Sequence, residues 1–329
     1  MKKIAKWLIT AATATSLGLA GMNAGAQEAY PSKPVKIIVP YAPGGAADLF
    51  ARTVAKHLQD GFGQPFIVDN RPGASQMLGA MAVATAPADG YTLFLGATGS
   101  LAVNTYTQSK NIKYDPVKDF APVSLGMTVP LFLVTTPALP AKNVKELIAL
   151  LKAAPGKYTY ASIGIGSSTH MAMEAFMKAT GTNMLHVPFK SSVPAISAMI
   201  AGTVDVNFDV GSTSIPMIKG GKLRVLAVGS AKRFPLMPDL PTVAEAADLP
   251  GFEASVWFGL VAPARTPRAV VDKLSKEINR VLHLPVLQDQ FLPLGLVLTP
   301  NTPDEFGTMI KAEVTKWNKE LREAGVQPE

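Results

Sequence analysis

The first third of the chain alternates short apolar runs with stretches of helical periodicity. Residues 35–40 (VKIIVP) are a β-branched run closed by proline, which predicts a strand. Residues 46–63 carry Leu49, Phe50 and Val54 at helical spacing and end in glycine, which predicts a helix. A strand, a helix and a strand follow at 65–73, 74–86 and 89–99. This order predicts a parallel sheet with helices on its faces.

A second α/β unit begins near residue 129 with the apolar run VPLFLVTTP. Residues 143–156 form an amphipathic pattern with Asn143 as the helix N-cap. Further strands are predicted at 158–164, 183–189, 204–210 and 223–230, and further helices at 167–181, 193–202 and 212–221, with one helix start at Pro194.

The last part of the chain contains one strand, 255–263, and two long helical patterns, 267–283 and 302–325. These helices have no sheet of their own, so we expect them to pack on the first unit. The chain then crosses between units near 129 and 253, which is typical of a hinge around a cleft. We predict an α/β, two-lobed fold with domain 1 at 27–128 and 253–329, and domain 2 at 129–252.

The N-terminus has the pattern of a secretory signal peptide. A basic start and a diluted apolar stretch precede the small residues Ala24 and Ala26, so residues 1–26 are predicted to be cleaved after Ala26. Three lysines leave with this segment, and the formal net charge falls from +7 to +4. The remaining charges are scattered, which does not indicate a nucleic-acid partner. The absence of cysteine excludes disulfides, thiolate metal sites and cysteine nucleophiles.

The segment VPYAPGGAADLFAR (39–52) carries the first candidate site. A Pro-Gly-Gly turn leads directly into a helix, whose first amide groups are unpaired and favour an anion. Asp48 lies in the first helical turn, where we expect it to accept main-chain hydrogen bonds and stiffen the loop. An ordinary strand-to-helix turn is the alternative.

A second loop of the same design lies in the other unit. Residues 160–176 run from a strand through two glycines and several hydroxyl side chains into a helix. If the two helix starts face each other across a cleft, together they can hold a carboxylate without an arginine. The candidate residues of this loop are Gly166, Ser167, Ser168, Thr169 and His170.

Enzyme motifs fit poorly. The dinucleotide fingerprint, the GxSxG nucleophile elbow, the P-loop and HExxH are all missed. His170 and Glu174 are either metal ligands or an i,i+4 polar pair. A Ser167, His170 and Asp209 triad can be drawn, which keeps a secreted serine hydrolase open. Asp209, at a strand end, and Lys190 each line the pocket or lie on its solvated rim.

The order and spacing of these segments resemble the extracytoplasmic receptors of tripartite tricarboxylate transporters, the Bug receptor family. The resemblance also includes NRPGAS, APADGYTL, HVPFKSSVPA and FGLVAPARTP, and it covers nearly the whole mature chain. It implies a Venus-flytrap, type II periplasmic-binding-protein fold that closes on a small organic acid. It also implies that the two loops hold the carboxylate and that Thr98 and Ser100 form the cavity wall. The first-loop residues carried over are Tyr41, Gly44, Gly45, Ala46, Ala47 and Asp48.

Two departures from the family pattern lie near the expected cleft. Ser75, Gln76 and Met77 stand where the family usually has further glycines, and Ser191 follows Lys190 where it usually has glycine. Gln76 is therefore a candidate to read a second polar group of the ligand, while Lys190 and Asp209 are alternatives for setting specificity.

The resulting prediction is a periplasmic, monomeric carboxylate receptor without cofactor, metal or catalytic activity. Its predicted partner is a tripartite tricarboxylate permease in the inner membrane. A receptor for a two-component sensor is the alternative. Dicarboxylates, aromatic acids, acidic amino acids and nicotinate-like compounds all remain open as ligands.

Overall fold

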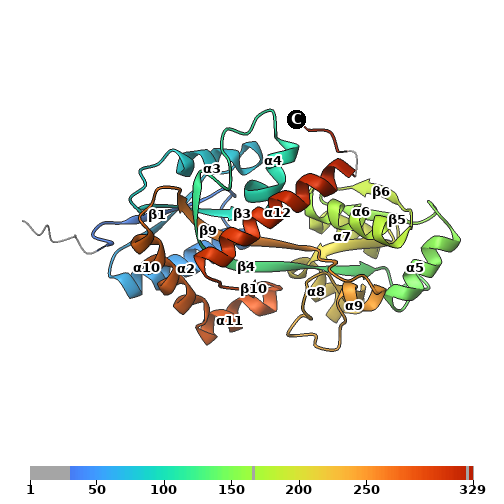
Figure 1. Ribbon diagram of the computed structural model, residues 1–329. Coiled ribbons are helices and arrows are strands. Elements are labelled where there is room, and N and C mark those ends of the chain that lie inside the picture. Colours follow the sequence, from blue (N-terminus) through green and yellow to red (C-terminus); the bar gives the residue numbers. More distant parts are fainter. Residues whose placement is uncertain (1–29, 165–166, 324–325, 329) are drawn as a thin grey trace, which may run out of the picture. The chain divides into compact units, whose positions relative to one another are not determined.

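The structure, a computed structural model, describes residues 30–164, 167–323 and 326–328, so the predicted signal peptide lies outside the described residues. Residues Lys33–Glu329 form one compact unit (Figure 1). The strands are β1 (Val35–Val39), β2 (Phe66–Asn70), β3 (Thr92–Ala97), β4 (Phe120–Thr135), β5 (Thr159–Ser162), β6 (Leu185–Pro188), β7 (Val206–Val210), β8 (Arg224–Val228), β9 (Ser255–Pro263) and β10 (Val297–Leu298). The longer helices are α2 (Ala46–Phe62), α3 (Met77–Ala84), α5 (Val144–Ala153), α6 (Ser168–Thr180), α7 (Ser192–Ile200), α8 (Gly211–Lys219), α10 (Arg268–Leu282) and α12 (Pro303–Glu323). The short helical segments are η1 (Ala74–Gln76), η2 (Gly99–Val103), α4 (Asn104–Thr107), α9 (Val243–Ala247), α11 (Pro285–Phe291) and η3 (Leu292–Leu294).

One half of the sheet has the order β2-β1-β3-β9-β4. β1 pairs in parallel with β2 and β3, as predicted. Ile38 packs on one face in a cluster with residues of α3 and α12, while α2 contacts β1, β2 and α10. Because β1 and β3 are parallel, their carboxyl ends lie at the same edge of the sheet. Helix α2 and segment η2 begin at this edge.

Strand β4 connects the two halves of the sheet. Its 16 residues pair antiparallel with β9 up to Pro130↔Ser255, and with β7 from Leu131↔Val210 onward. The sheet is therefore mixed rather than wholly parallel. The physical reason is that β4 takes the chain from one half to the other and β9 brings it back, so the two strands run in opposite directions.

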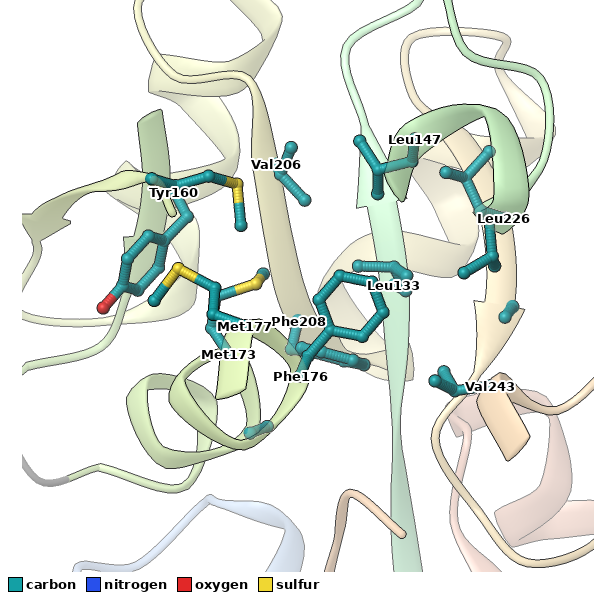
Figure 2. Close-up of a cluster of buried hydrophobic side chains, with 14 of the residues drawn as sticks. Leu133, Leu147, Tyr160, Met173, Phe176, Met177, Val206, Phe208, Leu226 and Val243 are labelled. Atoms are coloured by element: carbon teal, nitrogen blue, oxygen red, sulfur yellow. The ribbon is translucent and has the colours of Figure 1, made fainter. Parts of the chain in front are cut away.

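The other half has the order β4-β7-β5-β6, with β8 also paired to β4. Side chains of α5, α6 and α9 pack on one face of this half, where Phe208 and Phe176 meet edge to face with ring centres 6.1 Å apart (Figure 2). Helices α7 and α8 supply Ile196 and Ile215 to the opposite face. Each fully buried aromatic side chain contributes about 1.5–3 kcal/mol, so both faces are firmly held.

Most predicted helix ends agree with the structure. Asn143 caps α5 by accepting a hydrogen bond from the Glu146 amide at 2.9 Å. Helix α7 begins at Ser192, two residues before Pro194, because proline is tolerated in a first helical turn. Helix α10 packs against α2 and β4, and α12 against β4 and η2. Within the described residues, the helices are too short or too polar to cross a membrane.

Candidate functional site

The loop before α2 is braced by a buried carboxylate. Asp48 is 4% exposed and accepts hydrogen bonds from the Gly44 amide (2.9 Å) and from Arg52 Nε (3.0 Å) through Oδ2. Its Oδ1 accepts from Asn70 Nδ2 at 2.9 Å, and the same nitrogen contacts the Tyr41 carbonyl at 3.0 Å. These contacts tie the turn to β2. They give Asp48 the bracing role that its position in the first turn suggested.

The brace fixes both the charge and the backbone of this loop. The Arg52 guanidinium, followed by the Gly44 amide and Asn70, lowers the pKa of Asp48 to about 2, so the carboxylate stays ionised. Gly44 has φ of +91°, a conformation that side chains rarely adopt. Gly45 is the N-cap of α2 and has no side chain to bond the first amides of the helix. Those amides are positioned as anion donors.

Tyr41 begins this loop and lines the cavity described below. Its ring lies 5.8 Å from that of Phe258 on β9, at an angle of 59°. Burial raises the pKa of Tyr41 above its ordinary value, so the hydroxyl remains protonated and can donate a hydrogen bond.

The loop before α6 is braced by hydroxyl groups instead of a charge. Ser167 is the N-cap of α6, and its hydroxyl donates to the Gly164 carbonyl at 2.7 Å and accepts from the His170 amide at 3.3 Å. Thr169 is fully buried, and its hydroxyl accepts from the Ile163 amide at 3.0 Å. These neutral hydrogen bonds hold the turn.

Behind this loop, aromatic and imidazole rings form a stack. The ring centres of His170 and His186 lie 4.2 Å apart, and those of His186 and Tyr160 lie 4.8 Å apart. Desolvation lowers the pKa of both histidines. Glu174 accepts a hydrogen bond from the Tyr160 hydroxyl and lies 3.7 Å from His170 Nε2. This His170–Glu174 contact is the i,i+4 polar pair that the spacing allows, and the described residues contain no group of three side chains suited to a metal.

Residues 74–76 form a strained turn. Ala74, Ser75 and Gln76 have φ of 43°, 51° and 75°, all in the left-handed region. Such a conformation costs a non-glycine residue roughly 1–2 kcal/mol. Two hydrogen bonds hold the turn. Asn104 Nδ2 donates to the Ser75 carbonyl at 2.7 Å, and the main-chain amide of Gln76 donates to the Gly73 carbonyl at 3.0 Å. Strain retained in this way is typical of functional sites.

Thr98 and Ser100 follow β3 and are both buried. The Thr98 hydroxyl accepts from the Trp257 amide of β9 at 3.0 Å. The Ser100 hydroxyl accepts from the Ala97 amide at 3.0 Å, so it closes the end of β3. Thr98 lines the cavity described below, whereas Ser100 is fully buried and does not.

These segments surround a cavity of about 680 Å³, within the usual range for small-molecule sites. Sequence-predicted residues that line it are Tyr41, Gln76, Thr98, Ser167 and Ser168. The remaining lining residues are Ser75, Gly99, Val103, Asn104, Thr107, Gln108, Ile163, Met171, Val256, Trp317, Val326 and Gln327. None of these described lining residues carries an ionised side chain, so the donors that they offer to an anion are neutral.

The other predicted site residues lie beside this cavity or away from it. Residues 44–48 do not line it, Ser100 and Thr169 are buried in their turns, and His170 is in the ring stack. Gly166 lies outside the described residues. Sequence reasoning missed Asn104, Thr107 and Gln108, although their i, i+3, i+4 spacing would place them on one helix face. Trp317 and Gln327 reach the cavity only through tertiary packing.

Asp209 lies on β7 and is fully buried. Its Oδ2 accepts a hydrogen bond from the Thr213 hydroxyl, and desolvation raises its pKa. Lys190 is exposed. The contacts of Ser167, His170 and Asp209 described above give each of them partners outside the triad that can be drawn from the sequence.

The structure described as periplasmic binding protein BugD shares this fold; it is 33% identical with a TM-score of 0.72, covering 91% of this chain and 100% of its own. The structure described as R. palustris Rpa4515 with adipate is 34% identical with a TM-score of 0.76, covering 91% of this chain and 100% of its own. MatC from Rhodopseudomonas palustris with bound malate is 29% identical with a TM-score of 0.70, covering 89% of this chain and 100% of its own. The chain has the α/β fold of a periplasmic solute-binding protein, and the predicted fold class is confirmed.

The family can be stated more narrowly. A sequence profile described as "Tripartite tricarboxylate transporter family receptor" matches residues 50–326. Protein BugT of Bordetella pertussis (strain Tohama I) is 36% identical over 91% of this chain and 92% of BugT. The chain belongs to this family of receptors, which confirms the resemblance to the Bug receptors.

Proposed function

We propose that this protein captures a small organic carboxylate in the periplasm by hinge closure and delivers it to the membrane subunits of a tripartite tricarboxylate-type transporter. The observation that carries the proposal is the cavity of about 680 Å³, which is lined by Tyr41, next to one half of the sheet, and by Ser167 and Ser168, next to the other. A protonated hydroxyl and the start of α6 are suited to a carboxylate oxygen. The adipate and malate in the relatives' structures support an acid ligand.

The finer parts of the proposal have separate support. The predicted domains are residues 27–128 with 253–329, and residues 129–252. The chain passes between them near the paired strands β4 and β9, which we propose as the hinge. We expect cleavage after Ala26, which the intact mass of the exported protein measures. We expect a monomer, which its sedimentation measures. We expect no catalysis, since the family is a receptor family and Ser167 has other hydrogen-bond partners.

Thermal-shift screening of the purified mature protein against mono-, di- and tricarboxylates and acidic amino acids tests the function. A ligand that binds only the native state raises the melting temperature. At a concentration of 100 times its Kd it adds about 2.7 kcal/mol to the free energy of unfolding. Tyr41→Phe and Ser168→Ala should each reduce the shift. Ser197→Ala, on the exposed side of α7, should leave it unchanged. If calorimetry and thermal shift find no binding of any acid, the proposal is wrong.

A further inference from the structure

The Gln76 side chain presents a defined hydrogen-bonding group to the cavity. Its Oε1 accepts from the Ser100 amide at 3.2 Å, and because that amide can only donate, the facing atom must be the carbonyl oxygen. The Nε2 group has no hydrogen-bond partner among the described residues. Since Gln76 lines the cavity, this nitrogen is a donor available to a ligand.

The surrounding backbone makes room for this amide. A Cβ atom on Gly99 would lie 2.8 Å from Gln76 Nε2 and 3.2 Å from Oε1, so any side chain at 99 would displace the amide from this position. The strained turn 74–76 keeps Gln76 at φ of 75°, a backbone conformation that favours glycine, yet it carries this side chain. The turn therefore holds a specific side chain in place.

The chemistry around Gln76 is neutral. Asn104 and Trp317 line the same cavity, and none of its described lining residues is ionised. Helix α3 begins at the next residue, but neither Met77 nor Leu78 lines the cavity. A second carboxylate placed here would lose part of its hydration with no cation among the described lining residues to replace it, and the Ser100 amide at the start of η2 is already used by Gln76 Oε1. An uncharged acceptor would lose less and would satisfy the amide.

We propose that Gln76 selects the far end of the ligand, and that this end is an uncharged hydrogen-bond acceptor, such as a carbonyl oxygen or a ring nitrogen, rather than a second carboxylate. The proposal rests on the carboxylate-binding function above and names its substrate class. The ligand is then a monocarboxylate whose other end accepts one hydrogen bond from Gln76 Nε2.

Matched triplets of acids test this selectivity by isothermal titration calorimetry. One triplet is 5-oxohexanoate, glutarate and 5-methylhexanoate, and the other is 4-acetylbenzoate, terephthalate and 4-isopropylbenzoate. Triplets of the same design are made on any acid found by thermal shift. The ketone is expected to bind at least about tenfold more tightly than both of its partners, because only it pairs with the amide without burying a charge.

Variants then assign the selectivity to Gln76. Gln76→Met removes the donor. Gln76→Glu retains an acceptor for the Ser100 amide but replaces the donor with an oxygen. In both variants the Kd of the ketone acid should come within about threefold of the Kd of its alkyl partner. Gly99→Ala should do the same by displacing the amide. The alkyl acid's Kd should stay within about threefold, which shows that the cavity is intact. Gln59→Met, exposed on α2, is the matched control.

The outcomes separate the two proposals. If no carboxylate binds, the proposed function and this inference both fail. If dicarboxylates bind as tightly as the ketones or more tightly, the inference fails and the function stands. If the ketone preference survives in Gln76→Met and Gln76→Glu, Gln76 is not the selecting residue.

Discussion

The loops before α2 and α6 both present a helix start near the cavity, but they are braced differently. The first is tied by the Asp48 carboxylate to Gly44, Arg52 and Asn70. The second is tied by the hydroxyls of Ser167 and Thr169. The difference teaches that a turn can be held either by one ionised group or by several neutral ones. The two designs should then respond differently to substitution and to pH.

The largest expected effect is the loss of the charged brace. Asp48→Ala removes a buried carboxylate that accepts three hydrogen bonds and leaves the Gly44 amide, Arg52 and Asn70 without their shared acceptor. We expect a loss of roughly 2–4 kcal/mol in the free energy of unfolding, measured by urea denaturation. Asp69→Asn, which removes a surface pair with Arg71, should change it by at most about 0.5 kcal/mol. Equal losses in both variants would show that Asp48 is not a special brace.

The hydroxyl brace should depend less on any one group. Thr169→Val keeps the shape of a fully buried side chain but leaves the Ile163 amide unpaired, for an expected loss of about 1–2 kcal/mol. Thr315→Val, at an exposed hydroxyl of α12, should cost about 0.5 kcal/mol or less. If Thr169→Val costs as much as Asp48→Ala, the distinction between the two loops disappears.

Acid should weaken the two regions in sequence. The lowered pKa values of His170 and His186 mean that the stability from their neutral rings is fully present above about pH 6.5 and is lost as the pH falls below it. The pKa of about 2 for Asp48 means that its contribution, present above about pH 3.8, is lost only as the pH falls toward 2.

Unfolding free energies measured between pH 8 and pH 2.5 check this order. His170→Gln should reduce the decrease between pH 6.5 and pH 5, because the pKa of His170 is lowered by burial. Asp48→Asn should leave that decrease intact and flatten the one below pH 4. A wild-type curve that is flat from pH 8 to pH 4 would contradict the role given to the histidines.

The smallest effect concerns strain rather than a missing brace. Ser75→Gly should relieve a left-handed residue with φ of 51°, while adding chain entropy to the unfolded state. The net gain should be about 0.5 kcal/mol, measured as a rise in melting temperature. Gly156→Ala, at φ of +72° with open space around it, is the opposite control and should destabilise. A clear loss of stability in Ser75→Gly would show that its side chain supports the turn.

Much of the fold follows from local pattern. The periodicity of 46–63 gives α2, and Asn143 marks the start of α5, because helix spacing and capping act within a few residues. The direction of β4 and β9 could not be obtained this way. Their pairing depends on which half of the sheet each one enters and leaves, and it joins residues more than 100 positions apart.

The site divides along the same line. The sequence by itself determined the two glycine- and hydroxyl-containing loops and the position of Gln76, since these are short-range features of strand-to-helix turns. Only the tertiary structure decided that Asn104 and Trp317 share the cavity, that Asp48 faces Arg52 and Asn70, and that Ser100 is turned into its own strand end. Those relations depend on how helices and strands pack together, which no local pattern of residues encodes.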